Sequence, residues 1–157
     1  MFGVPVFAEE LERVVARYGI EVHKNSEVTE IDPGGYLQID KNTLRHNRFD
    51  TVFALGDAGS SPNSKTGAAI RKQAPVVVEN LLATMRGAAL PASYGGYSSC
   101  PLTTARNKML LAEFDYTMKP APSIPFIDTT HERRDMWFLK RYGLPALYWN
   151  AILTGRA

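Results

Sequence analysis

The chain has 157 residues, of which 45% are hydrophobic and 22% charged, a composition typical of globular domains and not of disordered or coiled-coil chains. This length provides for one ordinary domain with a sizeable core, and two complete nucleotide-binding domains would not fit. The net charge of +2 is too small to indicate a nucleic-acid partner, and a single cysteine excludes an intramolecular disulfide.

We find neither an export signal nor a membrane span in this sequence. Residues 1–15, MFGVPVFAEELERVV, carry acidic side chains where a secretory signal has a basic segment and an unbroken apolar run. No stretch reaches the roughly 18 to 20 consecutive apolar residues that are needed to cross a bilayer. We therefore expect that this chain does not cross a membrane.

The first elements expected along the chain belong to an α/β unit. Helical spacing of apolar residues predicts a helix over residues 8–18, and Gly19 follows where a helix end favours a left-handed residue. Two short strands are expected over residues 20–23 and 28–31, and a turn follows at residues 33–35. Together they predict half of an α/β unit.

The middle of the chain predicts a strand, a loop and a long helix. The apolar run at residues 51–55 predicts a buried strand, and residues 57–65 form a loop of small and polar residues. A periodic segment over residues 66–86 predicts a long helix that ends at Gly87. Pro75 is expected to bend or interrupt this helix, because an interior proline lacks a backbone donor and clashes with the preceding turn.

The last third predicts strands followed by helices. Residues 94–119 suit strands joined by a turn, and the proline-rich residues 120–125 are expected to be extended. Residues 132–153 predict two short helices, separated at residues 143–145 by Gly-Leu-Pro.

The most informative stretch is TVFALGDAGSSPNSK, residues 51–65, which precedes the predicted long helix. Gly56 at the end of a strand allows a ligand to approach the backbone, and the Asp57 carboxylate beside it can accept hydrogen bonds from ligand hydroxyl groups. The first amides of the next helix can face an electron-rich group; they belong to Thr66, Gly67 and Ala68. Taken alone, such a Gly-Asp pair is most often a helix cap or a tight turn.

This arrangement resembles the second flavin-contacting segment of the pyridine nucleotide-disulfide oxidoreductase superfamily. In that superfamily the aspartate binds the ribityl chain of FAD, and the following helix points at the flavin. The resemblance assigns these roles to Gly56, Asp57 and the start of the helix at residues 66–68. The first fingerprint of such proteins, G-x-G-x-x-G, does not occur in this sequence, so the adenine-binding half is expected to be missing.

A second informative stretch is YGGYSSCPLTTARNKMLLAEFDY, residues 94–116, which places Cys100 directly before a proline. We expect a turn that holds the thiol at a fixed geometry, although a lone cysteine is most often a small buried hydrophobe. This stretch, SKTGAA at residues 64–69, and the tail KPAPSIPF with ERRDMWFLKRYGLPALYW closely resemble the C-terminal portion of sulfide:quinone oxidoreductases. The resemblance covers nearly everything from Phe49 onward.

By this resemblance Cys100 is one of the redox-active cysteines beside the flavin, and it works with a second cysteine to accept sulfide sulfur as a persulfide. Electrons then reach quinone through FAD, so sulfide and quinone are the implied substrates. The second cysteine belongs to the missing half, which implies that this chain alone is inactive. Lys65 could place a positive charge near the flavin or the quinone, although an exposed lysine in a polar loop is the more common case.

The resemblance also implies an organisation of the chain. The expected fold class is α/β, with partial FAD/NAD(P)-binding domains and an α-helical, membrane-proximal C-terminal region. Residues 1–35 correspond to a partial second dinucleotide-binding domain, which we interpret as shortened at Pro33-Gly34-Gly35. Residues 36–90 form the FAD-contacting strand, turn and helix, and residues 91–157 form the region with the redox cysteine, near quinone and membrane.

The end of the chain is rich in aromatic and basic residues. They include Trp137, Phe138, Tyr142, Tyr148 and Trp149 among Lys140, Arg141 and Arg156. The residues alone slightly favour a packed helical hairpin, because aromatic stripes usually face a core. The family resemblance favours helices that lie on a membrane surface and admit quinone, hence a peripheral membrane protein.

Three other functions are compatible with parts of the sequence. An NADH:quinone dehydrogenase and a flavocytochrome-type sulfide dehydrogenase share the Gly-Asp strand, but the Ser-Ser-Cys-Pro stretch argues against the former. A non-catalytic membrane-docking domain is the alternative from another class, and assembly as a homo-oligomer is left open. No metal is predicted, because His23, His46 and His131 lack the spacing of metal ligands.

Overall fold

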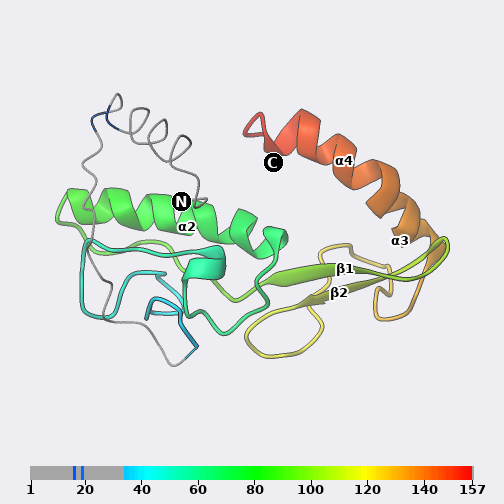
Figure 1. The fold of residues 1–157 in the computed structure, drawn as a ribbon, viewed down its shortest axis with the longest axis horizontal. Helices are drawn as coiled ribbons and strands as arrows, with labels where there is room; N and C mark the ends of the chain where they lie inside the picture. The colour runs from blue at the N-terminus through cyan, green and yellow to red at the C-terminus, as the bar shows by residue number, and fades with distance from the viewer. Residues whose placement is uncertain (1–15, 17–18, 20–33, 157) are drawn as a thin grey trace, which may run out of the picture. The chain divides into compact units, whose positions relative to one another are not determined.

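A computed structural model of the chain describes residues 34–156 together with Ala16 and Gly19 (Figure 1). The chain divides into two compact units, residues 1–30 and 31–157, and the second is described below. Gly19 has a φ of 69°, in the left-handed region expected for it. The rest of the helix predicted at residues 8–18 and the two short strands lie outside the described residues.

The longest described element is helix α2, Gly67–Met85 (Figure 1). Thr66 begins it, because its Oγ1 accepts a hydrogen bond of 3.2 Å from the backbone N–H of Ala69. Gly87 ends it with a φ of 65°, and its N–H donates to the carbonyl of Thr84 at 3.0 Å. The predicted helix and both of its ends are confirmed.

Helix α2 continues through Pro75 without a break. Of the two expected outcomes, a bend or an interruption, the interruption at Pro75 is therefore wrong. Gln73 and Val76 on either side of the proline are both buried, so tertiary packing supports the helix on both sides of Pro75. Such tertiary contacts offset the missing hydrogen bond and the clash of the proline ring.

The inward face of α2 carries small and polar side chains. Gln73 and Asn80 are fully buried. Asn80 Nδ2 donates to the carbonyls of Thr43 (2.9 Å) and Ala92 (3.0 Å), and Asn80 Oδ1 accepts the N–H of Ala92 at 3.0 Å. Most of the large apolar side chains in the second half of α2 are exposed instead, and we call four of them the apolar stripe of α2: Val78, Leu81, Leu82 and Met85, exposed by 54%, 39%, 42% and 76%.

The segment before α2 is irregular, and the buried strand predicted at residues 51–55 is wrong. Phe53 makes a single isolated bridge to Arg45, and Ala54 alone of these five residues is buried. The backbone N–H of Ala54 bonds to the carbonyl of Leu44 at 3.1 Å, within the same loop region. The apolar run therefore lies in a loop. A buried strand also needs a neighbouring strand to accept its backbone hydrogen bonds, and an apolar run in the sequence does not show that one is present.

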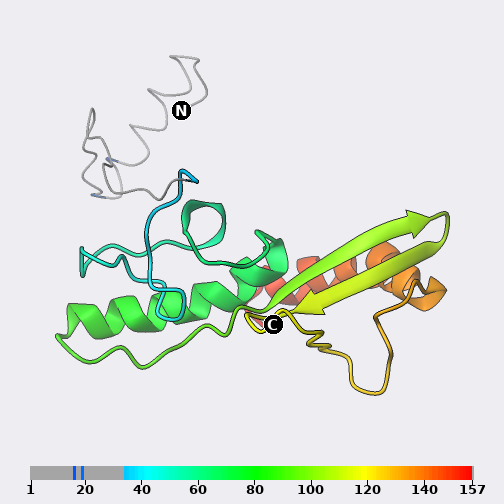
Figure 2. The ribbon, with the colours of Figure 1, turned by 90° about the horizontal axis from the view of Figure 1, so that it is seen from below.

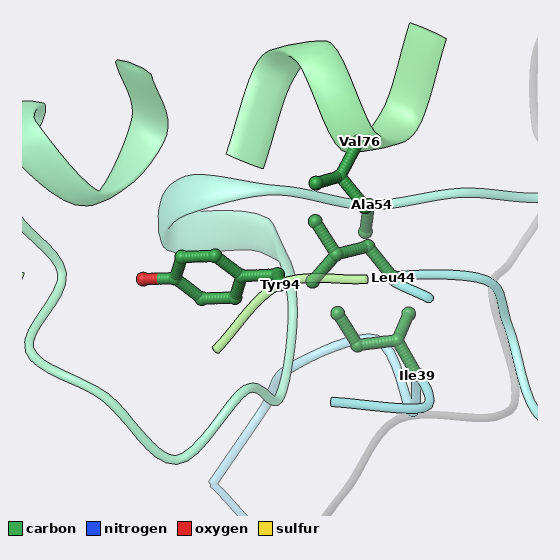
Figure 3. Packing of buried hydrophobic residues seen from close by; sticks show 5 residues of the cluster. All are labelled: Ile39, Leu44, Ala54, Val76 and Tyr94. Atoms are coloured by element: carbon green, nitrogen blue, oxygen red, sulfur yellow. The ribbon is translucent and has the colours of Figure 1, made fainter. Parts of the chain in front are cut away.

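A first core cluster forms where this irregular segment meets α2 (Figure 3). Val76 projects from the helix toward side chains from three separate loop segments. The buried members of the cluster are Ile39, Leu44, Ala54, Val76 and Tyr94. This cluster anchors the turn that precedes α2.

The chain then forms an antiparallel hairpin of strands β1, Ser98–Ala105, and β2, Lys108–Phe114 (Figure 2). The turn between them contains Asn107 with a φ of 60°, which asparagine tolerates. The predicted pair of strands is confirmed. Cys100, however, lies within β1 opposite Ala112 and not in a turn. Proline is acceptable beside it because β1 is an edge strand, where a missing N–H is tolerated.

The chain ends in a continuous helical segment, residues 134–152, coloured orange to red in Figure 1. It consists of α3 (Arg134–Phe138), the π-helical turn η2 (Leu139–Gly143), α4 (Leu144–Leu147) and the π-helical turn η3 (Tyr148–Ile152). The predicted separation at residues 143–145 is wrong, because Gly143 is helical, with φ −69° and ψ −49°. The wider π turn precedes Pro145 and makes room for its ring.

A second core cluster joins this helical segment to the hairpin. Met109 and Leu111 on one face of β2 pack with Met136 of α3, and all three are buried. The described part of the chain thus mixes helix and strand, as predicted. Its one extended sheet is this hairpin, so the described residues do not include the sheet of a nucleotide-binding domain.

Candidate functional site

The residues predicted for the site lie in two parts of the described structure. Gly56 and Asp57 belong to the short 3₁₀ helix η1, Gly56–Ala58, and residues 65–68 lie at the N-terminus of α2. Cys100 lies in β1. The structure therefore groups the predicted cofactor-binding residues around the start of α2 and places the cysteine on the hairpin.

Glycine is required at position 56 by the fold itself. Gly56 has a φ of 60°, and a Cβ at this position would lie 3.0 Å from the side chain of Ile70. Its N–H donates to Gln73 Oε1 at 2.8 Å, so the buried amide of α2 fixes the turn. The adjacent Asp57 is exposed, and its carboxylate is available to accept hydrogen bonds from a ligand.

The N-terminus of α2 is open to an approaching group. Gly67 is exposed, and a Cβ added there would meet nothing within 4 Å. The first-turn amides of a 19-residue helix carry the positive end of its dipole. This end of α2 can therefore stabilise negative charge on a group placed against it.

Lys65 is engaged within its own loop. Its Nζ donates to the carbonyl oxygens of Gly59 and Ser61, the latter at 3.0 Å, and lies 4.8 Å from the centre of the Tyr36 ring. The ammonium group thus closes the loop that connects η1 to α2. Its predicted role near a flavin stays a prediction, but the structure shows this further role, which the sequence analysis missed.

Cys100 carries a free, half-buried thiol. Directly opposed residues of an antiparallel pair share one face, so Cys100 shares a face of the hairpin with Ala112. Side chains alternate along a strand, and Met109 and Leu111 therefore lie on the opposite face, which packs on α3. The face that carries Cys100 is not the face that the C-terminal helical segment covers.

A buried carboxylate on the hairpin was missed by the sequence analysis. Glu113 accepts hydrogen bonds from the Tyr97 hydroxyl and from both the hydroxyl and the N–H of Ser123. Burial raises the pKa of Tyr97, and the hydrogen bond to Glu113 raises it further. The alternation of β2 is the signal that could have found Glu113, since it falls on the buried face with Met109 and Leu111. This cluster fastens the segment after β2 to the hairpin.

A pocket beside the loop that precedes α2 contains one predicted site residue, Lys65, and none of the others. It has a volume of about 510 Å³ and is lined by the polar loop at residues 60–65 together with Tyr36, Phe114 and Met118. Neither Asp57 nor Cys100 lines this pocket. Shape alone therefore does not single out the predicted site within the described residues.

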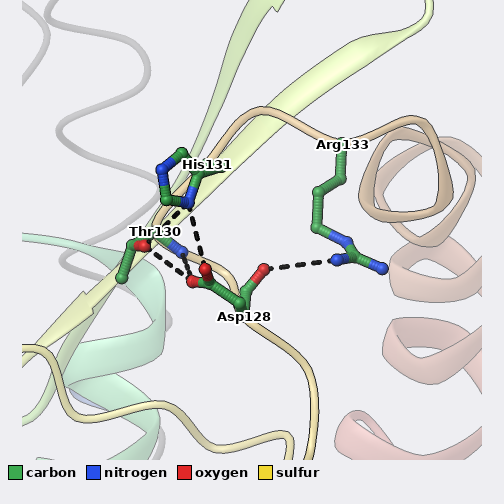
Figure 4. Close-up of polar contacts among 4 residues, drawn as sticks. All are labelled: Asp128, Thr130, His131 and Arg133. Carbon is green, nitrogen blue, oxygen red and sulfur yellow. Dashed lines mark hydrogen bonds and ion pairs between the residues drawn. The ribbon is translucent and has the colours of Figure 1, made fainter.

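An Asp-His-Thr group on the surface has the residue types of a catalytic triad but not its geometry (Figure 4). His131 Nδ1 lies 3.0 Å from Asp128 Oδ2 and 3.1 Å from Thr130 Oγ1, so both partners meet the same ring nitrogen. A triad needs the two partners on different ring nitrogens. Hydrogen bonds from Thr130, followed by that of His131, lower the pKa of Asp128 to about 2. The group stabilises an exposed turn.

The described residues form neither a metal site nor a membrane-spanning helix. Within residues 34–156, no three His, Cys, Asp or Glu side chains gather in a way that could hold a metal ion. Among the helices described, none combines the length and the apolar character that a membrane span requires.

Comparison with known proteins gives a clear relationship. No family model matches the chain. The mitochondrial sulfide:quinone oxidoreductases of Dictyostelium discoideum and Mus musculus are 46% and 40% identical over 136 and 135 residues, 86% of this chain in each case. That of Schizosaccharomyces pombe is 44% identical over 130 residues, 80% of the chain. The chain spans only 28% to 29% of the length of these relatives.

Identities of this size over most of the chain place it in an oxidoreductase family. The chain belongs to the sulfide:quinone oxidoreductases and corresponds to one part of such a protein. The resemblance of its motifs predicted this family.

One solved structure shows a similar fold. A chain of the cryo-EM structure of the Tetrahymena thermophila mitochondrial ATP synthase F1Fo tetramer matches with a TM-score of 0.67 and 24% identity. The match covers 76% of this chain and 29% of that chain. It supports the arrangement of the described elements and carries no functional argument.

Proposed function

We propose that this chain is the part of a sulfide:quinone oxidoreductase that carries one redox cysteine and one side of the FAD site. The observation that carries this proposal is the identity of 40% to 46% to three sulfide:quinone oxidoreductases over at least 80% of the chain. An NADH:quinone dehydrogenase or a flavocytochrome-type enzyme is disfavoured by the same observation.

The start of α2 would hold the flavin part of FAD. The exposed carboxylate of Asp57 would accept hydrogen bonds from ribityl hydroxyls, while Gln73 holds the turn at Gly56. The open first turn at Gly67 and Ala68 would stabilise negative charge at the edge of the ring. When bound, FAD supplies an acceptor for two electrons. Lys65 would support this site by closing the loop between Asp57 and α2.

Cys100 would take part in capturing the sulfide sulfur. Sulfide would attack a disulfide between Cys100 and a second cysteine; the S–S bond breaks, and one cysteine becomes a persulfide while the other leaves as a thiolate. Cys100 is the only cysteine in this chain. The second cysteine would therefore lie in the part of the enzyme that corresponds to the unmatched length of the relatives. We therefore expect the chain alone to be catalytically inactive.

The apolar stripe of α2 supports the proposal that the chain works as one part of a larger protein. A helix exposed to water normally turns its apolar side chains inward, but here the polar Gln73 and Asn80 are buried and the stripe is exposed. A further layer of protein against the stripe would complete the burial. This fits the proposed organisation, with residues 1–35, 36–90 and 91–157 as parts of the second dinucleotide-binding, FAD-contacting and quinone-proximal regions.

The C-terminal helical segment would contact the membrane. Four of its five aromatic side chains are exposed, among them Tyr142 by 60% and Trp149 by 67%, while Trp137 packs against the second core cluster. Exposed tryptophan and tyrosine favour the headgroup level of a bilayer, and nearby lysine and arginine are attracted to anionic lipid. We propose that this segment lies on the membrane surface, where the enzyme meets its quinone.

Replacing Trp149 with serine is expected to weaken binding to vesicles of phosphatidylcholine and phosphatidylserine by about tenfold, because a large interfacial side chain is lost. Cosedimentation of the purified chain with these vesicles measures the effect. Phe49→Ser is the matched control, since Phe49 is an exposed aromatic outside the segment. Equal loss in the two variants, or none in Trp149→Ser, would contradict the proposed contact.

A chimera tests the proposed function directly. The segment of the Dictyostelium discoideum relative that matches this chain is replaced by this chain, and the product is purified with its flavin. We expect a yellow protein that reduces quinone in the presence of sulfide. A folded, flavin-containing chimera that oxidises NADH but not sulfide would favour the NADH:quinone dehydrogenase alternative. A folded chimera that retains no flavin would favour the non-catalytic alternative.

A further inference from the structure

Lys140 connects the C-terminal helical segment to the strand that carries Cys100. Its Nζ donates to the carbonyl oxygen of Pro101 at 2.7 Å and to Thr103 Oγ1 at 3.0 Å. The lysine lies in the π-helical turn η2, and its side chain is half-buried. We propose that Lys140 is a positioning residue that holds the Cys100-Pro101 stretch in place. The inference rests on the proposed role of Cys100.

The geometry of the hairpin explains why this carbonyl needs a partner. Successive residues of an antiparallel strand direct their backbone groups alternately toward the paired strand and away from it. The carbonyl of Pro101 is bound by Lys140 from outside the hairpin, so it points away from β2. Among the described strands β1 has β2 as its single neighbour, and proline supplies no N–H at this edge. Lys140 therefore satisfies an outward carbonyl next to the cysteine.

The same helical segment also holds the other strand. Met109 of β2 and Arg133, directly before α3, exchange backbone hydrogen bonds of 3.0 Å and 2.8 Å. Met136 then packs on this strand in the second core cluster. With these contacts on β2 and Lys140 on β1, the start of the helical segment fastens both strands of the hairpin. Of these contacts, Lys140 acts nearest in sequence to Cys100.

The neighbouring cation provides a matched comparison. Arg141 carries the same charge in the same turn, but its guanidinium lies 5.9 Å from the ring of Tyr142, within its own segment. Losing Arg141 changes the charge of the segment by the same amount as losing Lys140. A difference between the two variants therefore reports the contact with β1 and not the charge.

The test uses the thiol of Cys100, which is the only cysteine in the chain. Alkylation by iodoacetamide is followed by mass spectrometry in the purified, folded chain. Lys140→Met is expected to raise the alkylation rate by about three- to tenfold, because the strand loses a charge-assisted hydrogen bond and opens more often. Arg141→Met is expected to react at the original rate, and Lys140→Arg to restore it. An unchanged rate in Lys140→Met, or an equal rise in Arg141→Met, overturns the proposal.

Amide hydrogen exchange separates a local effect from a loss of the whole fold. In Lys140→Met we expect faster exchange in β1 and unchanged exchange in α2. Equal acceleration in both elements would mean general destabilisation and would overturn the positioning role. If Lys140→Met does not fold, Thr103→Val removes one of the two acceptors while keeping the lysine, and a smaller rise in alkylation is expected. These measurements need neither flavin nor quinone, so they can fail while the proposed function stands.

Discussion

Replacing Cys100 with serine in the chimera is expected to abolish sulfide-dependent quinone reduction, with a loss of about a thousandfold or more. Serine has nearly the same shape, so the hairpin and its pairing with Ala112 should be kept. A hydroxyl group, however, cannot form the disulfide that sulfide attacks and cannot carry a persulfide sulfur. The rate of quinone reduction at saturating sulfide measures the effect.

The control for this substitution is Ser99→Ala, which changes the neighbouring residue on the opposite face of β1. It should keep most of the activity. The flavin absorbance of both variants should equal that of the unsubstituted chimera, because Cys100 is not among the residues that are proposed to hold FAD. Undiminished turnover in Cys100→Ser would remove this cysteine from the mechanism and leave the membership of the chain in its family untouched.

Replacing Asn80 with alanine is expected to lower the free energy of unfolding of the chain by about 3–5 kcal/mol, because three backbone groups lose their partner together. These groups are the carbonyls of Thr43 and Ala92 and the N–H of Ala92. Asn80 is fully buried, so water does not replace the lost bonds without local opening. Urea unfolding, followed by circular dichroism, measures the change.

Glu79→Ala is the matched control for Asn80, because Glu79 is the preceding residue of α2 and is exposed. It should change the free energy of unfolding by no more than about 0.5 kcal/mol. A loss below about 1 kcal/mol in Asn80→Ala would show that the buried amide contributes little beyond its shape. Such a result would mean that α2 is held chiefly by Val76 and the first core cluster.

Local signals in the sequence were sufficient to predict some elements. Thr66 and Gly87 mark the ends of α2, because a hydroxyl cap and a left-handed glycine act on the backbone within one turn. The hairpin at residues 98–114 followed from its strand-forming residues and a short turn. The family was also evident from the sequence, because motifs such as SKTGAA and SSCP are local strings of residues.

Tertiary structure decided which way these elements face and what they contact. Periodicity shows that α2 has two faces, but the partners of Asn80 lie 12 and 37 residues away and turn its polar face inward. Residues 51–55 form a loop because this apolar run pairs through a single isolated bridge, Arg45 to Phe53, and no continuous strand lies beside it in the described structure.

Cys100 also shows what local sequence predicts and what tertiary structure decides. The sequence by itself determined that Cys100 lies in a family motif. Only the tertiary structure placed this cysteine in an edge strand. The tertiary structure also joined the next residue, Pro101, to Lys140, which lies 39 positions further along the chain. Contacts over such separations depend on how the whole chain packs, and no local pattern of residues encodes them.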